Sequence, residues 1–242
     1  MIAGPIVYSL SDAELVLRRY ASFAATMPDE LGVSVGMTSG QDGQPMLMFL
    51  PLWNGDKQRG ERIMSDFQAI GSPLLAQVGP MNYSDMLALF DGWLDAADGC
   101  HWEFRTRSLP ALTPDAIDVM TTAVAGRTSP YSMVYFHHLH GVATRIPAEK
   151  IAFGLRQEHF MLEIIAGWRP DDGSAAAHRQ WAQDLSDALV PFALPGGYAT
   201  FLRPQDREQA KVAYGSNRAR LRSLKRRFDP DGVFASAIPL PD

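Results

Sequence analysis

The feature that most constrains the fold is a pair of apolar runs joined by a short turn. In residues 31–37, apolar side chains alternate with small ones, which is the period of a half-buried strand. Residues 46–53 form a second apolar run, and the segment 39–43 between them, Ser-Gly-Gln-Asp-Gly, has the composition of a turn. Two strand-like runs joined in this way predict an antiparallel hairpin.

Further strand-like and helical runs follow one another along the chain. We expect strands at residues 2–8, around 102–104, at 131–139 and 142–146 as a second hairpin, at 160–168 and at 197–202. Helices with one apolar side are predicted at 83–90 and after Ser11, Asp56, Thr113 and Ser174. Antiparallel strand pairs with helices between them predict an α+β fold, in which an antiparallel sheet has helices packed on one face.

The end of the chain predicts a helical tail. Leu221, Leu224 and Phe228 share one side of a helix that Ser216 can cap, and an Asp-Pro pair directly after Phe228 ends it. The chain carries no linker-like segment, so we divide it into one domain at residues 1–202 and a C-terminal helix and tail at 203–242.

Composition limits the kind of protein and its partners. A net charge of −5 argues against binding to a nucleic-acid backbone. No apolar run approaches the roughly 20 residues of a membrane span, and the N-terminus does not resemble a signal peptide. The single cysteine, Cys100, fits a reducing compartment, so we expect a cytoplasmic protein without nucleic-acid or membrane partners.

Several motifs along the chain resemble the berberine-bridge-enzyme-like FAD-linked oxidases. The most specific begins at Tyr214 with Tyr-Gly-x-Asn and continues as Arg-Leu-x-x-Leu-Lys and Phe-Asp-Pro-Asp. Others are Ala-Gly-Pro-Ile at 3–6, Gly-Pro-Met-Asn-Tyr at 79–83, Ala-Phe-x-x-Arg at 152–156 and Tyr-Ala-Thr-Phe at 198–201. The resemblance implies the substrate-binding domain and the C-terminal motif of that family, without its N-terminal FAD-binding domain.

The resemblance implies an FAD-dependent oxidoreductase that oxidises a hydroxyl or amine carbon of a small molecule, with hydride transfer to the flavin. FAD would be held only with a partner flavin-binding chain, so we expect a homodimer or a hetero-complex. Departures from the family pattern, Leu155, Thr200, Arg218, Gly232, Ala235 and Ala237, favour an alternative. In that alternative the chain is a flavin-free binding or interaction module that keeps the fold.

Glu163 is the leading catalytic candidate. It interrupts an apolar run, and strand alternation places it on one face with Met161 and Ile165. By resemblance this face lies against the flavin, so Glu163 would assist substrate deprotonation while Met161 and Ile165 bind substrate. An apolar setting makes a carboxylate a stronger base. The alternative is a surface position at which Glu163 is simply hydrated.

Tyr198 is the second catalytic candidate, because the matching tyrosine of the family points at the substrate. A core position would explain it equally well. The resemblance also assigns substrate binding to Arg156 and cofactor binding to Thr200, Tyr214 and Asn217.

The histidines at 137, 138 and 140 do not predict a metal site. Only His138 and His140 share a strand face, and no carboxylate stands at a ligand spacing nearby. A structural or solvent-facing cluster is the better interpretation.

Overall fold

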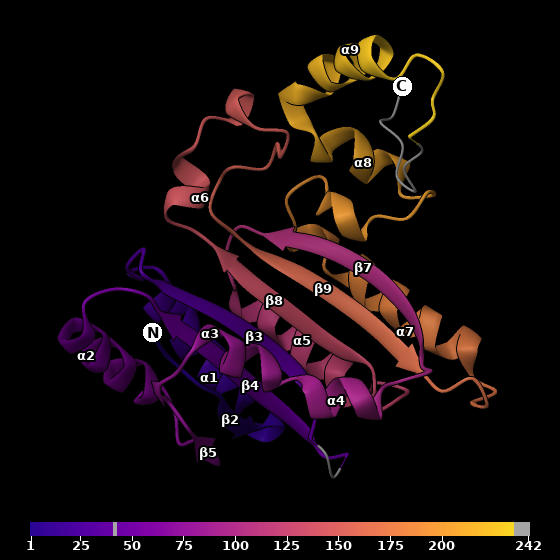
Figure 1. The fold of residues 1–242 in the computed structure, drawn as a ribbon. Helices are drawn as coiled ribbons and strands as arrows, with labels where there is room; N and C mark the ends of the chain where they lie inside the picture. Colours follow the sequence, from indigo (N-terminus) through magenta and orange to yellow (C-terminus); the bar gives the residue numbers. More distant parts are fainter. Residues whose placement is uncertain (41–42, 235–242) are drawn as a thin grey trace.

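The structure is a computed structural model that describes residues 1–40 and 43–234. The turn residues 41–42 and the tail residues 235–242, with Ala235 and Ala237, lie outside the described residues. A nine-stranded sheet forms from the described part of the chain, with strand order β5-β2-β4-β3-β8-β9-β7 and with β1 beside β4 and β6 (Figure 1). The strands are β1 (Ile2–Ala3), β2 (Ile6–Ser9), β3 (Leu31–Ser39), β4 (Pro45–Trp53), β5 (Leu75–Ala76), β6 (Gly79–Pro80), β7 (His101–Leu109), β8 (Met133–Leu139) and β9 (His159–Trp168).

The predicted hairpin at 31–53 is confirmed. Strands β3 and β4 pair antiparallel from Leu31 opposite Trp53 to Ser39 opposite Pro45. Strand β8 then pairs with β3 on one side and with β9 on the other, both antiparallel. The middle of the sheet is therefore made of long strands whose side chains alternate between two faces.

The long helices α1 (Ala13–Ala24), α5 (Pro114–Ala125) and α7 (Ala175–Ala188) lie side by side over one face of the sheet (Figure 1). Helix α2 (Lys57–Gln68) packs beside them against β4, whereas the short α3 (Tyr83–Ala88) and α4 (Asp91–Ala96) lie on the opposite side. Beyond one end of the sheet lie α6 (Val142–Arg145), α8 (Arg207–Ala213) and α9 (Arg218–Phe228). The predicted α+β class is confirmed, and the long helices pack on one face of the antiparallel sheet.

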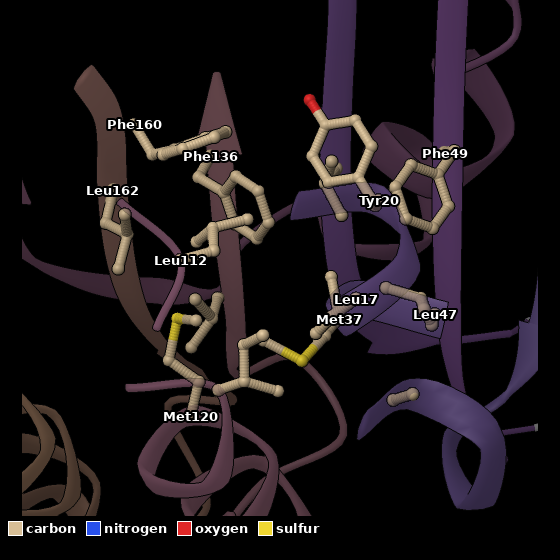
Figure 2. Packing of buried hydrophobic residues seen from close by; sticks show 14 of the residues in the cluster. Leu17, Tyr20, Met37, Leu47, Phe49, Leu112, Met120, Phe136, Phe160 and Leu162 are labelled. Atoms are coloured by element: carbon tan, nitrogen blue, oxygen red, sulfur yellow. The ribbon is translucent and has the colours of Figure 1, made fainter. Parts of the chain in front are cut away.

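The core lies between the sheet and these long helices. Figure 2 shows Tyr20 of α1 against Phe49 of β4. Their ring centroids are 5.1 Å apart, and the rings meet edge-on. Tyr20 also meets Phe67 of α2 at 5.9 Å. Such aromatic pairs contribute about 0.5–1.5 kcal/mol each beyond the area they bury. Because Tyr20 contacts both a strand and a second helix, it fixes α1 and α2 against the same strand.

Two predicted strands are wrong. Residues 142–146 were expected to return as a strand, but the chain turns at Gly141 (φ 65°) into helix α6. Residues 197–202 were also expected as a strand, but Ala199–Phe201 form a 3-10 turn. At the second segment, Gly196 (φ 94°) redirects the chain, and it then crosses the face of the sheet so closely that a Cβ at Gly197 would lie 2.9 Å from the Thr106 side chain.

The helix caps are partly as predicted. Thr113 and Asp56 accept hydrogen bonds from the backbone N–H groups of Ala116 and Arg59, three residues on. Ser11 does not cap α1, since it lies within a short 3-10 turn. Ser216 likewise lies in a 3-10 turn before α9 and makes no cap. The predicted end of α9 at Phe228 is confirmed.

Candidate functional site

The face of the sheet opposite α1, α5 and α7, here called the open face, carries Glu163. Strand β9 turns Phe160, Leu162 and Ile164 into the helix-covered core, so Met161, Glu163 and Ile165 lie on the open face. The alternation expected from the sequence is therefore present. Met161 and Ile165 are buried, and the Glu163 side chain is only 13% exposed. A carboxylate with so little contact with water requires nearby polar partners.

These partners come from strands β3 and β8. Tyr135 of β8 stands directly opposite Glu163, and His137 stands opposite Ser34 of β3. The Nε2 atom of His137 lies 3.6 Å from Oε1 of Glu163. On the other side of the same ring, Nδ1 is 3.0 Å from the Ser34 hydroxyl oxygen. Strands β3 and β8 thus place an imidazole and a phenol beside the carboxylate, with the Ser34 hydroxyl on the far side of the imidazole.

Tyr135 has room to lie flat because its neighbour on β3 is Gly36. A Cβ at Gly36 would lie 3.0 Å from Cδ2 of the Tyr135 ring. Burial raises the pKa of Tyr135 and the charge of Glu163 raises it further, whereas a hydrogen bond with the Ser34 side chain lowers it. A neutral phenol, able to donate a hydrogen bond, therefore faces the candidate site at neutral pH.

Sequence reasoning did not identify Ser34, Tyr135 and His137 as site residues. Alternation within the run 131–139 could have placed Tyr135 and His137 on one face, opposite Phe136 and His138. Their proximity to Ser34 and Glu163 depends on which strands are neighbours, however, and a single sequence does not give that pairing.

Tyr198 lies on the same side of the sheet as Glu163. Its ring packs against Phe201 at 5.6 Å, and Phe201 stacks on Phe104 of β7 at 5.7 Å with the ring planes 13° apart. The preceding residue, Gly197, lies over Thr106, the residue of β7 that pairs with Glu163. The structure gives Tyr198 a ring contact with Phe153, and it gives no contact between Tyr198 and Glu163 among the residues described.

Thr200 lines a cavity of about 250 Å³ where the segment 199–203 crosses β7. Trp102, Phe104 and Phe201 supply its aromatic wall. Arg203 also lines it, but its guanidinium donates hydrogen bonds to Glu103 and Asp206. The lining of this cavity beside the open face is thus partly aromatic and partly charged.

The remaining predicted residues lie in and around the loop that joins β8 to β9. Arg156 donates from Nε to the carbonyl of Ile146 at 3.2 Å, and its guanidinium lies over the Phe153 ring. Asn217 is buried, and its amide donates to the carbonyls of Ala148 and Ile151 at 2.8 and 2.9 Å. The backbone of Tyr214 packs against Gly154, where a Cβ would come within 2.7 Å. Asn217 and Tyr214 thus join the tail to the loop, and Arg156 makes its contacts within the loop. Met161, Glu163 and Ile165 form the sheet face itself.

His138 and His140 stack on one another, with their centroids 4.6 Å apart, while His137 points to the other face, as the alternation predicted. The residues at 1–40 and 43–234 contain no group of three or more His, Cys, Asp or Glu side chains that could hold a metal ion. None of the helices in the described part of the chain is long and apolar enough to cross a membrane.

Comparison with known proteins supports the family resemblance. Residues 198–241 match the family model described as berberine and berberine like. The uncharacterized FAD-linked oxidoreductase YvdP of Bacillus subtilis is 21% identical over 98% of this chain and 53% of its own length. The FAD-linked oxidoreductase aurO of Gibberella zeae is 25% identical over 96% of this chain and 46% of its own length. The chain therefore spans about half the length of the curated relatives it matches.

Solved structures share the fold. A variant of berberine bridge enzyme, described as a reticuline dehydrogenase, superimposes with a TM-score of 0.84 at 16% identity, over 99% of this chain and 55% of that one. A BBE-like protein from Arabidopsis thaliana, number 28, gives 0.83 at 15% identity, over 99% and 56%. Together with the motif match and the curated relatives, this fold confirms the resemblance first seen in the sequence, a resemblance to the berberine-bridge-enzyme-like FAD-linked oxidases.

Proposed function

We propose that this chain supplies the substrate-binding side of an FAD-dependent oxidoreductase that oxidises a hydroxyl or amine carbon of a small molecule. The observation that carries the proposal is the enclosed carboxylate of Glu163, which lies on the open face between buried Met161 and Ile165. The matched relatives are FAD-linked oxidoreductases, which supports the same class of chemistry.

The open face fits one side of a flavin ring. An isoalloxazine is flat and largely apolar with polar atoms at its edge, and the apolar side chains of Met161 and Ile165 flank the Glu163 carboxylate along the strand. These three side chains would face the ring. When bound, the flavin would supply a hydride acceptor. A flavin-binding domain outside the described residues would hold the rest of the cofactor.

Glu163 would act as the base toward the substrate. Its carboxylate would accept the proton of the hydroxyl or amine while the adjacent carbon loses a hydride, and such acid–base assistance contributes about 10²- to 10⁴-fold. Met161 and Ile165 would exclude water from the carboxylate. The Tyr198 phenol would contact substrate from the segment that crosses β7, and the cavity beside Thr200 would accept a flat part of the substrate.

The test is Glu163→Gln in the complete flavoprotein that contains this chain. We expect anaerobic flavin reduction by substrate to slow by about 10²- to 10⁴-fold, because the amide keeps the shape and cannot take the proton. Glu208→Gln is the matched control, since that side chain is 85% exposed on α8, and it should reduce at the wild-type rate. Equal rates for wild type and Glu163→Gln would refute the assignment.

A flavin-free binding module is the alternative. The cavity beside Thr200 and Phe201 favours it, because this chain alone forms that cavity. Two results together would favour it: Glu163→Gln leaves the rate of flavin reduction unchanged, and the isolated chain binds a small aromatic ligand that the Phe201→Ala variant no longer binds. The binding-module interpretation would then replace the oxidoreductase one.

A further inference from the structure

We propose that His137, whose ring is fixed by Ser34, is a positioning residue that holds the Glu163 carboxylate toward the substrate. The inference rests on the proposed function of Glu163 and extends it. It assigns a role to Ser34 on β3 and His137 on β8, which the pairing of β3 with β8 and of β8 with β9 brings to the face that carries Glu163.

The first support is geometric. Ser34, His137 and Glu163 lie on three adjacent strands, β3, β8 and β9, and their side chains share the open face. The imidazole bridges the other two residues, with Nδ1 at 3.0 Å from the serine oxygen and Nε2 at 3.6 Å from the glutamate oxygen. The second distance exceeds a hydrogen bond. Contacts of catalytic groups are often long before substrate binds and shorten in the complex.

The second support is the direction in which the protons can be donated. The serine hydroxyl carries a single proton. If it donates that proton to Nδ1 of His137, the ring proton must sit on Nε2, the atom that faces Glu163. Every donor in this series then has an acceptor, and the series ends at the carboxylate. When the Ser34 hydroxyl donates to Nδ1, it therefore selects the Nε2–H tautomer, which can donate to Glu163.

The third support is packing around the ring. The Tyr135 and His137 rings meet edge-on at 5.1 Å, and Tyr135 itself lies against Gly36. His137 keeps 39% of its side chain exposed, whereas Glu163 keeps 13%. The imidazole is thus held on two sides and still open to solvent on a third, so it can be replaced without leaving a cavity in the core.

The first experiment uses the isolated chain without flavin. Long-range ¹H–¹⁵N NMR of the imidazoles at neutral pH reports which ring nitrogen carries the proton. We expect the Nε2–H tautomer for His137 in the wild type and a mixture of tautomers in Ser34→Ala, with the His101 signals unchanged as an internal control. An Nδ1–H tautomer in the wild type would overturn the proposal. So would a His137 spectrum that is the same in Ser34→Ala as in the wild type.

The second experiment uses the complete flavoprotein. His137→Leu should lower the rate constant for flavin reduction by about 10- to 100-fold with little change in substrate KM, because a misplaced catalytic group costs rate rather than binding. His137→Gln keeps a donor near the position of Nε2 and should recover most of that rate, while His101→Leu should match the wild type.

The outcomes separate this inference from the proposed function. If Glu163→Gln slows flavin reduction and His137→Leu does not, the role of His137 alone is overturned. If Glu163→Gln leaves the rate of flavin reduction unchanged, both proposals are overturned, whatever the tautomer of His137. Failure of His137→Gln to recover any rate also contradicts a positioning role through Nε2.

Discussion

At the scale of single residues, His138 is a buried titratable group that the fold keeps uncharged. Its ring lies between His140 at 4.6 Å and Phe160 at 4.4 Å, and its side chain is 1% exposed. Burial, and then the neighbouring His140, lower the pKa of His138 to about 4, although Glu158 opposes this by accepting a hydrogen bond from Nε2. Burial also lowers the pKa of the adjacent His159.

The pKa of His138 predicts how stability changes with pH. The unfolded chain binds a proton at this histidine near its ordinary pKa of 6.5, and the folded chain does so only near 4. Stability should therefore be complete above about pH 6.5 and fall as the pH drops towards 4, by about 1–2 kcal/mol after allowance for solvent screening at exposed Glu158. Urea unfolding at about pH 5 and about pH 7 measures this loss.

The matched comparison uses two phenylalanine variants. His138→Phe keeps the ring stack with Phe160 and removes the titration, so its stability should fall less between the two pH values. His101→Phe alters an exposed histidine and should retain the wild-type difference. An identical pH difference in His138→Phe and in the wild type would contradict the assignment.

The contacts between strands in the candidate site could not be predicted from the sequence, whereas the face of each strand could. The face that carries Glu163 could be predicted from alternation within one strand, a local property. Its contact with His137 depends on the pairing of β8 with β9, and that of His137 with Ser34 joins residues 103 positions apart. Such register depends on the packing of the whole sheet, which a period-2 pattern does not encode.

At the scale of elements, Asn217 holds the helical tail to the rest of the molecule. Its buried amide donates to two backbone carbonyls, those of Ala148 and Ile151, ahead of helix α9. Asn217→Ala should leave both carbonyls without these donors and cost about 1–3 kcal/mol, confined to the tail. Hydrogen exchange should quicken across 207–228 and remain unchanged in β3 and β4.

Ser216→Ala is the control for that experiment. Ser216 is the exposed neighbour of Asn217, and its hydroxyl makes no cap, so its loss should leave exchange in α8 and α9 as it was. Equal exchange in Asn217→Ala and in the wild type would show that other contacts hold the tail.

The elements differ in how well their sequences specify them. Strand β9 was predictable because its length and alternation suit a buried strand. The segments 142–146 and 197–202 carry similar short apolar patterns, yet they form helix α6 and a 3-10 turn. In both cases a glycine with positive φ, Gly141 or Gly196, redirects the chain beforehand. The conformation of the chain after each glycine is then decided by its tertiary neighbours, which explains both errors.

At the scale of the whole molecule, the two faces of the sheet have separate roles. The helix-covered face supplies the main apolar core, and the open face carries the candidate site. Both the loop after β8 and the tail lie beyond one end of the sheet (Figure 1). The protein can therefore vary the residues of the open face without disturbing the core, as expected where function is built on a stable scaffold.

Helix α9 leaves its apolar side exposed within the described part of the chain. None of its residues is buried, and Leu224 and Phe228, four positions apart on one side, are 39% and 70% exposed. Exposed apolar side chains grouped on one side of a helix favour association.

We expect the isolated chain to form a homodimer, or a hetero-complex with a flavin-binding partner, through this side of α9. Light scattering at about 100 µM should show a species larger than the monomer, with Phe228→Asp shifting it towards monomer and Leu15→Asp, an exposed site on α1, leaving it unchanged. A strictly monomeric wild type, both alone and mixed with a flavin-binding partner, would exclude this interface.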